Sequence, residues 1–173
     1  MGGVTCRLWQ RFRLWYNYNR EVYSVEKTVV IMMGIQGSGK STFYHRFLSK
    51  DFVRINLDTL KTRHREGQLI GECMANGQSY AIDNTNPTKE GRMRYISTAK
   101  AEGYRVVGYF MESKLSECIE RNNRRIGKER IPPIAIASTS NKLQMPSYDE
   151  GFDELYFVKN DGEAMTVFEW RDE

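Results

Sequence analysis

The feature that most constrains this chain is an apolar run followed directly by a glycine-rich segment that ends in lysine and serine. Residues 28–33 read TVVIMM, and residues 34–41 read GIQGSGKS. The second segment fits the spacing G-x-x-x-x-G-K-[ST], in which glycines bring backbone amides close to an anion and the next helix offers its free N–H groups. A simple glycine-rich turn would need neither the strand before it nor the helix after it. The sequence therefore predicts a loop that binds a nucleoside triphosphate.

The residues of this loop have separate expected tasks. Lys40 would reach the β- and γ-phosphates, and the Ser41 hydroxyl would bind Mg²⁺. The residues that we expect to bind the nucleotide are Gly34, Gly37, Ser38, Gly39, Lys40, Ser41 and Thr42.

Strand-like and helix-like segments alternate after residue 25. This alternation predicts an α/β fold, a three-layer sandwich with a central parallel sheet and helices on both faces. In such a sheet, ligands bind at the carboxyl ends of the strands. The expected strands are residues 28–33, 52–56, 79–83, 105–111 and 155–158. The expected helices are residues 40–50, 59–66, 89–102, 114–124 and 134–143.

Acidic residues follow the second and third of these strands. Asp58 lies just beyond the second strand, where a carboxylate facing the γ-phosphate could accept the proton of an attacking hydroxyl. The same residue could also cap the helix that follows. Asp83 ends the third strand, where a carboxylate would hold Mg²⁺. Residues 84–87, with the sequence NTNP, are in addition typical of a turn.

Positive charge gathers in one segment late in the chain. The formal net charge is +4, and residues 121–130, RNNRRIGKER, carry five basic side chains. Arginines here could bind the oxygens of a phosphoryl group, in a loop that closes over the site as a lid. A basic helix end that complements the helix dipole is the other interpretation, and it needs only one or two of these charges.

Size and cysteine usage limit the class of protein. A chain of 173 residues is long enough for one domain with a sizeable core. Cys6, Cys73 and Cys118 are odd in number and scattered, which favours a reducing compartment over a disulfide framework or a zinc site. No apolar run is long enough to cross a bilayer, and the N-terminus lacks the order of a secretory signal. We therefore expect a cytoplasmic protein that does not act at a membrane.

Taken together, these segments resemble the 5′-kinase module of the polynucleotide kinase/phosphatase family. The resemblance covers about residues 29–157 and rests on GIQGSGKSTF, NLDTL, IDNTNP, the arginines of residues 121–125, and EGF at residues 150–152. It implies a P-loop kinase that transfers the γ-phosphate of ATP to a 5′-hydroxyl end of DNA or RNA, with Mg²⁺. It also implies that Asp58 is the general base and that Asp83 contacts the acceptor and the metal. Arg121 and Arg125 would belong to the lid, Arg121 as a nucleotide-binding residue and Arg125 as a catalytic one.

The chain departs from the family at two positions next to Asp58. Leu57 stands where the family usually has a basic residue, and Lys61 stands where phage-type relatives have an arginine that binds the acceptor phosphate. Lys61 is therefore the expected acceptor-binding residue, but it supplies a point charge without the fork of a guanidinium group. The acidic nucleophile motif of the phosphatase half is absent, so a separate phosphatase or ligase is a candidate partner.

The resemblance leaves the first 24 residues unexplained. Aromatic residues alternate there with arginines, a composition that suits contact with single-stranded nucleic acid. An arm packed on the domain, a disordered end and an amphipathic helix on a membrane surface are the other interpretations. We therefore expect an N-terminal arm, residues 1–24, and a P-loop kinase domain, residues 25–173. A kinase of a small hydroxylated metabolite and a nucleotide-dependent binding module remain alternatives to the polynucleotide kinase.

Overall fold

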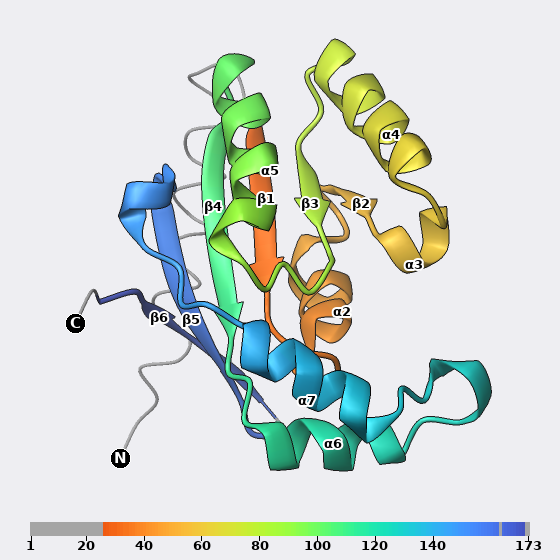
Figure 1. The fold of residues 1–173 in the computed structure, drawn as a ribbon. Helices are drawn as coiled ribbons and strands as arrows, with labels where there is room; N and C mark the ends of the chain where they lie inside the picture. Colours follow the sequence, from red (N-terminus) through yellow and green to blue (C-terminus); the bar gives the residue numbers. More distant parts are fainter. Residues whose placement is uncertain (1–25, 163, 172–173) are drawn as a thin grey trace.

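The computed structural model describes residues 26–162 and 164–171, which form a six-stranded sheet with helices around it (Figure 1). The strand order is β2-β3-β1-β4-β5-β6. All neighbouring strands are parallel except β5 and β6, which are antiparallel. The strands are β1 (Thr28–Met33), β2 (Val53–Ile55), β3 (Tyr80–Ile82), β4 (Arg105–Met111), β5 (Glu154–Asn160) and β6 (Met165–Glu169).

Helices cover both faces of the sheet and its carboxyl edge. In Figure 1, α6 and α7 cross below the carboxyl ends of the central strands, next to the start of α2. The helices are α2 (Lys40–Phe43), the π-helical turn η1 (Tyr44–Leu48), α3 (Leu57–Leu60), α4 (Arg63–Ala75), α5 (Lys89–Ala101), α6 (Leu115–Asn123), the 3₁₀ turn η2 (Gly127–Glu129), α7 (Pro133–Lys142) and the 3₁₀ turn η3 (Tyr148–Glu150).

Strand β1 is buried on both sides, which explains its continuous apolar sequence. Val29, Ile31 and Met33 pack in a core with residues of α4 and α5. Val30 and Met32 face the other way and pack with residues of α2 and η1. The two cores fix β1 between its neighbours β3 and β4, and so place the loop after β1 at the middle of the carboxyl edge.

The predicted bounds of β1 and β4 are confirmed, and the α/β fold with a mostly parallel sheet is confirmed as well. The prediction did not include β6, a short antiparallel edge strand whose five residues contain no long apolar run.

The predicted helix 59–66 is wrong, because the helix is interrupted at Lys61, which has φ 70°. Asn56 accepts a hydrogen bond from Thr59 N at the start of α3, and Thr62 accepts one from Arg65 N at the start of α4. Two separate capping residues therefore make two helices out of the segment expected to form one.

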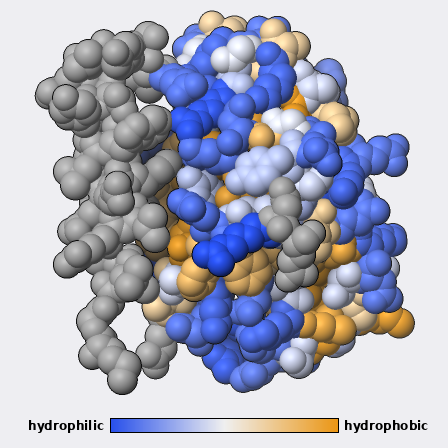
Figure 2. All heavy atoms as spheres, turned by 90° about the vertical axis from the view of Figure 1, so that its left-hand side faces the viewer, coloured by the Kyte–Doolittle hydropathy of each residue, from blue (hydrophilic) through white to orange (hydrophobic). Residues whose placement is uncertain are grey.

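The predicted arm, residues 1–24, lies outside the described residues, so the domain boundary at residue 25 stays a prediction. Within the described part, no helix is both long enough and apolar enough to span a bilayer. Figure 2 shows the side of the molecule with β5 and β6, where the surface is mostly hydrophilic with smaller hydrophobic areas between.

A buried ion pair joins α5 to η3 near the end of the chain. In the pair Arg92–Glu150, the guanidinium group and the carboxylate group are both almost completely buried. Arg92 Nε and Nη2 each donate to one carboxylate oxygen of Glu150 at 2.7 Å, and Arg92 Nη1 donates to Asn86 O at 3.1 Å. This pair gives a structural reason for the glutamate of the EGF segment, and its third bond supports the loop that follows β3.

Removing the cation of this pair should destabilise the fold strongly. We expect Arg92→Met to lower the free energy of unfolding by about 3 kcal/mol, because it leaves the Glu150 carboxylate buried and unpaired. Urea denaturation measures the loss. The double variant Arg92→Met/Glu150→Met is the control and should lose clearly less than the single variant. Equal losses in the single and double variants would contradict this account.

Candidate functional site

The loop between β1 and α2 has the backbone geometry that phosphate binding requires. Gly34, Gly37 and Gly39 all have positive φ, of 146°, 83° and 102°. At Gly37 a side chain is excluded by space as well, because a Cβ atom there would lie 2.4 Å from Cys118 O. The loop is also held from outside, since Arg121 Nε donates to Gly37 O at 2.8 Å. The predicted glycine-rich loop is therefore packed closely against α6.

Lys40 is the buried cation of the loop. Its Nζ donates to Gly34 O at 2.8 Å and to Ile35 O at 2.9 Å. Burial lowers the pKa of Lys40 to about 8, while the negative charge of Asp83 acts in the opposite direction. Weaker electrostatic effects on this pKa come from Arg125 and Asp58. Of the residues predicted to be catalytic, Asp58 and Arg125 therefore each lie near enough to Lys40 to influence its charge.

The lowered pKa of Lys40 makes nucleotide binding depend on pH. Phosphate binds the protonated lysine, and above pH 8 the free protein increasingly loses that proton. We expect the affinity for an ATP analogue to be flat below pH 7.5 and to fall by up to about tenfold per pH unit above pH 8. Calorimetric titration from pH 7 to 9.5 measures this. Lys40→Met should bind more weakly with no such decline, and a decline of the same steepness in Lys40→Met would contradict the assignment.

Asp83 and Ser41 form the side of the site that suits a metal ion. Asp83 is 2% exposed, and Ser41 Oγ donates to its Oδ2 at 3.1 Å. A hydroxyl and a carboxylate are the hard oxygen ligands that Mg²⁺ prefers. Within residues 26–162 and 164–171 there is no cluster of three or more His, Cys, Asp or Glu side chains that could hold a metal. The residues present therefore fit an ion that takes its other ligands from phosphates and water.

The buried polar atoms of the loop also fit an anion. Ser38 Oγ is fully buried and has no hydrogen-bond partner among the described residues. A buried hydroxyl without a partner is costly, and a phosphate oxygen would satisfy it.

Asp58 is exposed in the first turn of α3, and the capping alternative for it is wrong. Asn56 is the N-cap, with its Oδ1 accepting from Thr59 N at 3.1 Å. Asn56 Nδ2 donates to Asp83 O at 2.6 Å, so the start of α3 is tied to the end of β3. Asp58 is therefore available for chemistry and is held on the same carboxyl edge as Asp83.

A polar network around the buried Glu66 carboxylate, which the sequence alone does not reveal, supports this arrangement. Asn84 Oδ1 accepts from Leu57 N at 2.9 Å, and Asn84 Nδ2 donates to Glu66 Oε1 at 2.8 Å. Tyr95 OH donates to the same oxygen of Glu66 at 2.9 Å, and Arg63 Nη1 donates to Glu66 Oε2 at 2.7 Å. The NTNP sequence predicts a turn residue at Asn84, but the Asn84 side chain joins β3 to both α3 and α4.

The other predicted site residues lie at varied positions. Arg121 is half-buried in α6 against the loop backbone, and its role on phosphates stays a prediction. Arg125 is exposed just after α6, with Nη1 3.5 Å from Glu129 O. Thr42 is exposed in α2, and Lys61 is exposed at the break between α3 and α4.

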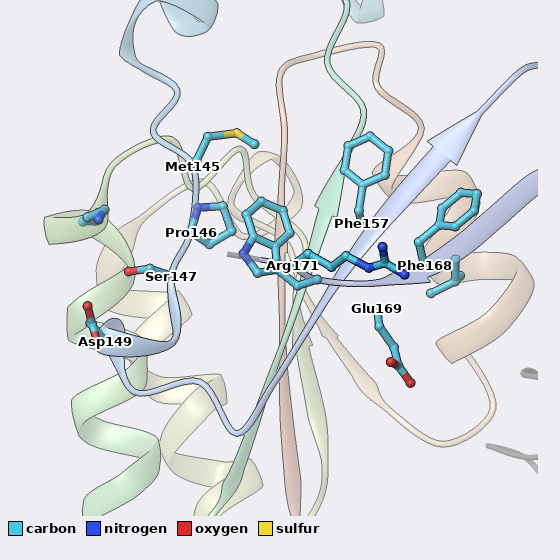
Figure 3. Close-up of a pocket in the computed structure, with 11 residues that line it drawn as sticks. Met145, Pro146, Ser147, Asp149, Phe157, Phe168, Glu169 and Arg171 are labelled. Atoms are coloured by element: carbon cyan, nitrogen blue, oxygen red, sulfur yellow. The ribbon is translucent and has the colours of Figure 1, made fainter. Parts of the chain in front are cut away.

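A hollow of about 1140 Å³ lies between the segment after α7 and strands β5 and β6. Figure 3 shows Met145 and Pro146 on one side of it and Phe157 and Phe168 on the other. Its lining includes no residue of the glycine-rich loop and none of Asp58, Asp83 or Ser41. The glycine-rich loop after β1, with its buried lysine, remains the expected nucleotide site.

Comparison with known families agrees with this geometry. Residues 29–145, more than half of the chain, match the AAA domain family AAA_33. The chain belongs to this family. A bifunctional polynucleotide phosphatase/kinase of Schizosaccharomyces pombe is 31% identical over 135 residues, which is 75% of this chain and 33% of that protein. The chain thus spans about a third of the length of the polynucleotide phosphatase/kinases that it matches.

Solved structures of other proteins share the fold of this chain. A gluconokinase from Sinorhizobium meliloti has a TM-score of 0.57 at 20% identity, covering 78% of this chain and 83% of its own. A chain of the Pnkp1/Rnl/Hen1 RNA repair complex has a TM-score of 0.57 at 23% identity, covering 72% of this chain and 46% of its own. At these identities the likeness shows the fold, that of a P-loop kinase. The family and the named relatives support the prediction of a phosphotransferase, and the fold implies nucleotide binding.

Proposed function

We propose that this chain transfers the γ-phosphate of ATP to the 5′-hydroxyl end of a polynucleotide. The observation that carries the proposal is the position of Asp58. It is an exposed carboxylate on the carboxyl edge of the sheet, tied through Asn56 to the strand end that bears Asp83, and close enough to affect Lys40. An acceptor hydroxyl placed between Asp58 and the γ-phosphate would lose its proton to Asp58 as it attacks in line.

The remaining residues of the site bind and orient. Lys40 would hold the β- and γ-phosphate oxygens, and Arg125 would approach them as the loop after α6 closes. Lys61, three residues beyond Asp58, would contact the acceptor strand as a point charge. Ser41 and Asp83 would hold Mg²⁺, which supplies neutralising charge for the phosphate oxygens when it is bound.

The name of the Schizosaccharomyces pombe relative supports a polynucleotide as the acceptor. The RNA repair complex supports a second expectation, that a phosphatase or ligase works together with this kinase. A small hydroxylated metabolite is the second candidate acceptor, because the gluconokinase shares the fold over most of both chains.

Transfer of labelled γ-phosphate tests the proposal. Wild-type protein would be incubated with ATP, Mg²⁺ and short oligonucleotides of DNA and of RNA that end in a 5′-hydroxyl. Matched oligonucleotides that already carry a 5′-phosphate are the control and should accept no label. Label on the 5′-hydroxyl oligonucleotides alone supports the proposal. Label on gluconate or another small polyol, with none on any oligonucleotide, would contradict it and favour the metabolite kinase.

A further inference from the structure

Arg54 of β2 contacts the two side chains that we assign to the metal. Arg54 Nε donates to Asp83 Oδ2 at 2.8 Å, and Nη2 of the same guanidinium forms an ion pair with that oxygen. Arg54 Nη2 also donates to Ser41 Oγ at 2.9 Å. One guanidinium group therefore covers both Asp83 Oδ2 and Ser41 Oγ.

The fold holds Arg54 at this position. Val53 and Ile55 of the same strand pack in the core, so alternation along β2 turns Arg54 to the opposite side from them. Its guanidinium lies over the ring of Tyr44 at 5.4 Å, and Nη1 is 3.4 Å from His45 Nε2. The Arg54 side chain is 27% exposed, so it has room to move toward solvent.

We propose that Arg54 and Mg²⁺ compete for Ser41 Oγ and Asp83 Oδ2, so that Arg54 sets the metal concentration this kinase requires. This inference rests on the proposed metal site. A guanidinium group only donates hydrogen bonds, whereas a metal ion needs the oxygen lone pairs that those bonds use. Two cations at the same two oxygens also repel each other. Metal binding therefore requires that Arg54 leave, and Arg54 is a positioning residue that acts through Asp83 and Ser41.

The alternative is that Arg54 merely neutralises the buried carboxylate of Asp83. That role needs no bond to Ser41, and it predicts that loss of Arg54 weakens the fold without improving metal binding. Competition predicts instead that loss of Arg54 strengthens metal binding, because both oxygens become free to bind the ion.

Metal affinity measured without any acceptor separates these two roles. Mn²⁺ would be titrated into the protein with a stoichiometric non-hydrolysable ATP analogue, and the free ion followed by electron paramagnetic resonance. We expect Arg54→Met to bind Mn²⁺ roughly tenfold more tightly than wild type, a modest effect for one unit charge removed at contact distance. Arg54→Gln, which keeps a neutral donor, should fall between the two. Arg46→Ala removes the same charge from the exposed surface of η1 and should bind as wild type does.

Thermal unfolding gives a second measurement that phosphoryl transfer does not influence. Arg54→Met without metal should melt below wild type, because Asp83 is then buried and unpaired, and added Mg²⁺ should raise its Tm more than that of wild type. Unchanged or weaker Mn²⁺ binding in both Arg54→Met and Arg54→Gln would overturn the proposal. Tighter binding together with no label on any oligonucleotide would keep this inference and reject only the polynucleotide acceptor.

Discussion

Replacing Lys40 by alanine should lower kcat/KM for phosphoryl transfer by about a thousandfold. Lys40 is the buried cation of the loop, and its Nζ is held by two loop carbonyls where the β- and γ-phosphates would bind. Alanine removes this charge and leaves the backbone amides, so part of the nucleotide affinity should remain. Initial rates with labelled ATP and a 5′-hydroxyl oligonucleotide measure the loss.

The same substitution should not weaken the fold. The pKa of Lys40 is lower in the folded protein than the ordinary value for lysine, so below pH 8 folding must bury a charge at a cost. Lys40→Ala removes that cost at neutral pH, and urea denaturation should show stability close to that of wild type. If Lys40→Ala retained more than a tenth of the wild-type activity, the proposed role of Lys40 would be rejected. If Lys40→Ala lost activity because it unfolded, the activity of Lys40→Met would be measured to test the role.

Replacing Asp58 by asparagine should lower kcat by between about a hundredfold and ten thousandfold, because asparagine cannot accept the proton of the attacking hydroxyl. The KM for ATP should change little, since Asp58 is exposed in α3 and lies outside the glycine-rich loop. The helix itself should persist, because its cap is Asn56. Steady-state kinetics with the oligonucleotide as variable substrate separate the two constants.

Asp51→Asn is the matched control for this substitution. Asp51 is an exposed aspartate between η1 and β2, and its replacement makes the same change in charge. We expect wild-type kcat in Asp51→Asn. Wild-type kcat in Asp58→Asn as well would exclude Asp58 as the general base and would require another group to take the proton.

The parts of the molecule that could be predicted from sequence are those encoded by neighbouring residues. The loop after β1 and the strand β4 each follow from a short local pattern. The break at Lys61 is also local, but it depends on a positive φ, which is uncommon for lysine and could not be predicted from the residue type. The expected helix 59–66 was wrong for that reason.

The parts that could not be predicted are contacts between residues far apart in the chain. Arg54 contacts Asp83, 29 positions away, and Asn84 contacts Leu57, 27 positions away. The one available signal for Arg54 was a charged residue within the apolar strand segment FVRI, which suggests a buried partner without saying which one. Sequence therefore located the strand ends, and only the fold showed which side chains meet there.

Asp83 and Asn84 are neighbours in the chain, yet their side chains serve opposite sides of the proposed reaction. Asp83 contacts Ser41 on the nucleotide side, and Asn84 contacts Leu57 and Glu66 on the acceptor side. A single peptide unit, with its fixed spacing of about 3.8 Å between Cα atoms, therefore sets the separation of the two halves. In the proposed reaction, this fixed spacing would help to hold the acceptor hydroxyl at a constant distance from the phosphate. We expect substitutions in α4 to leave that spacing unchanged.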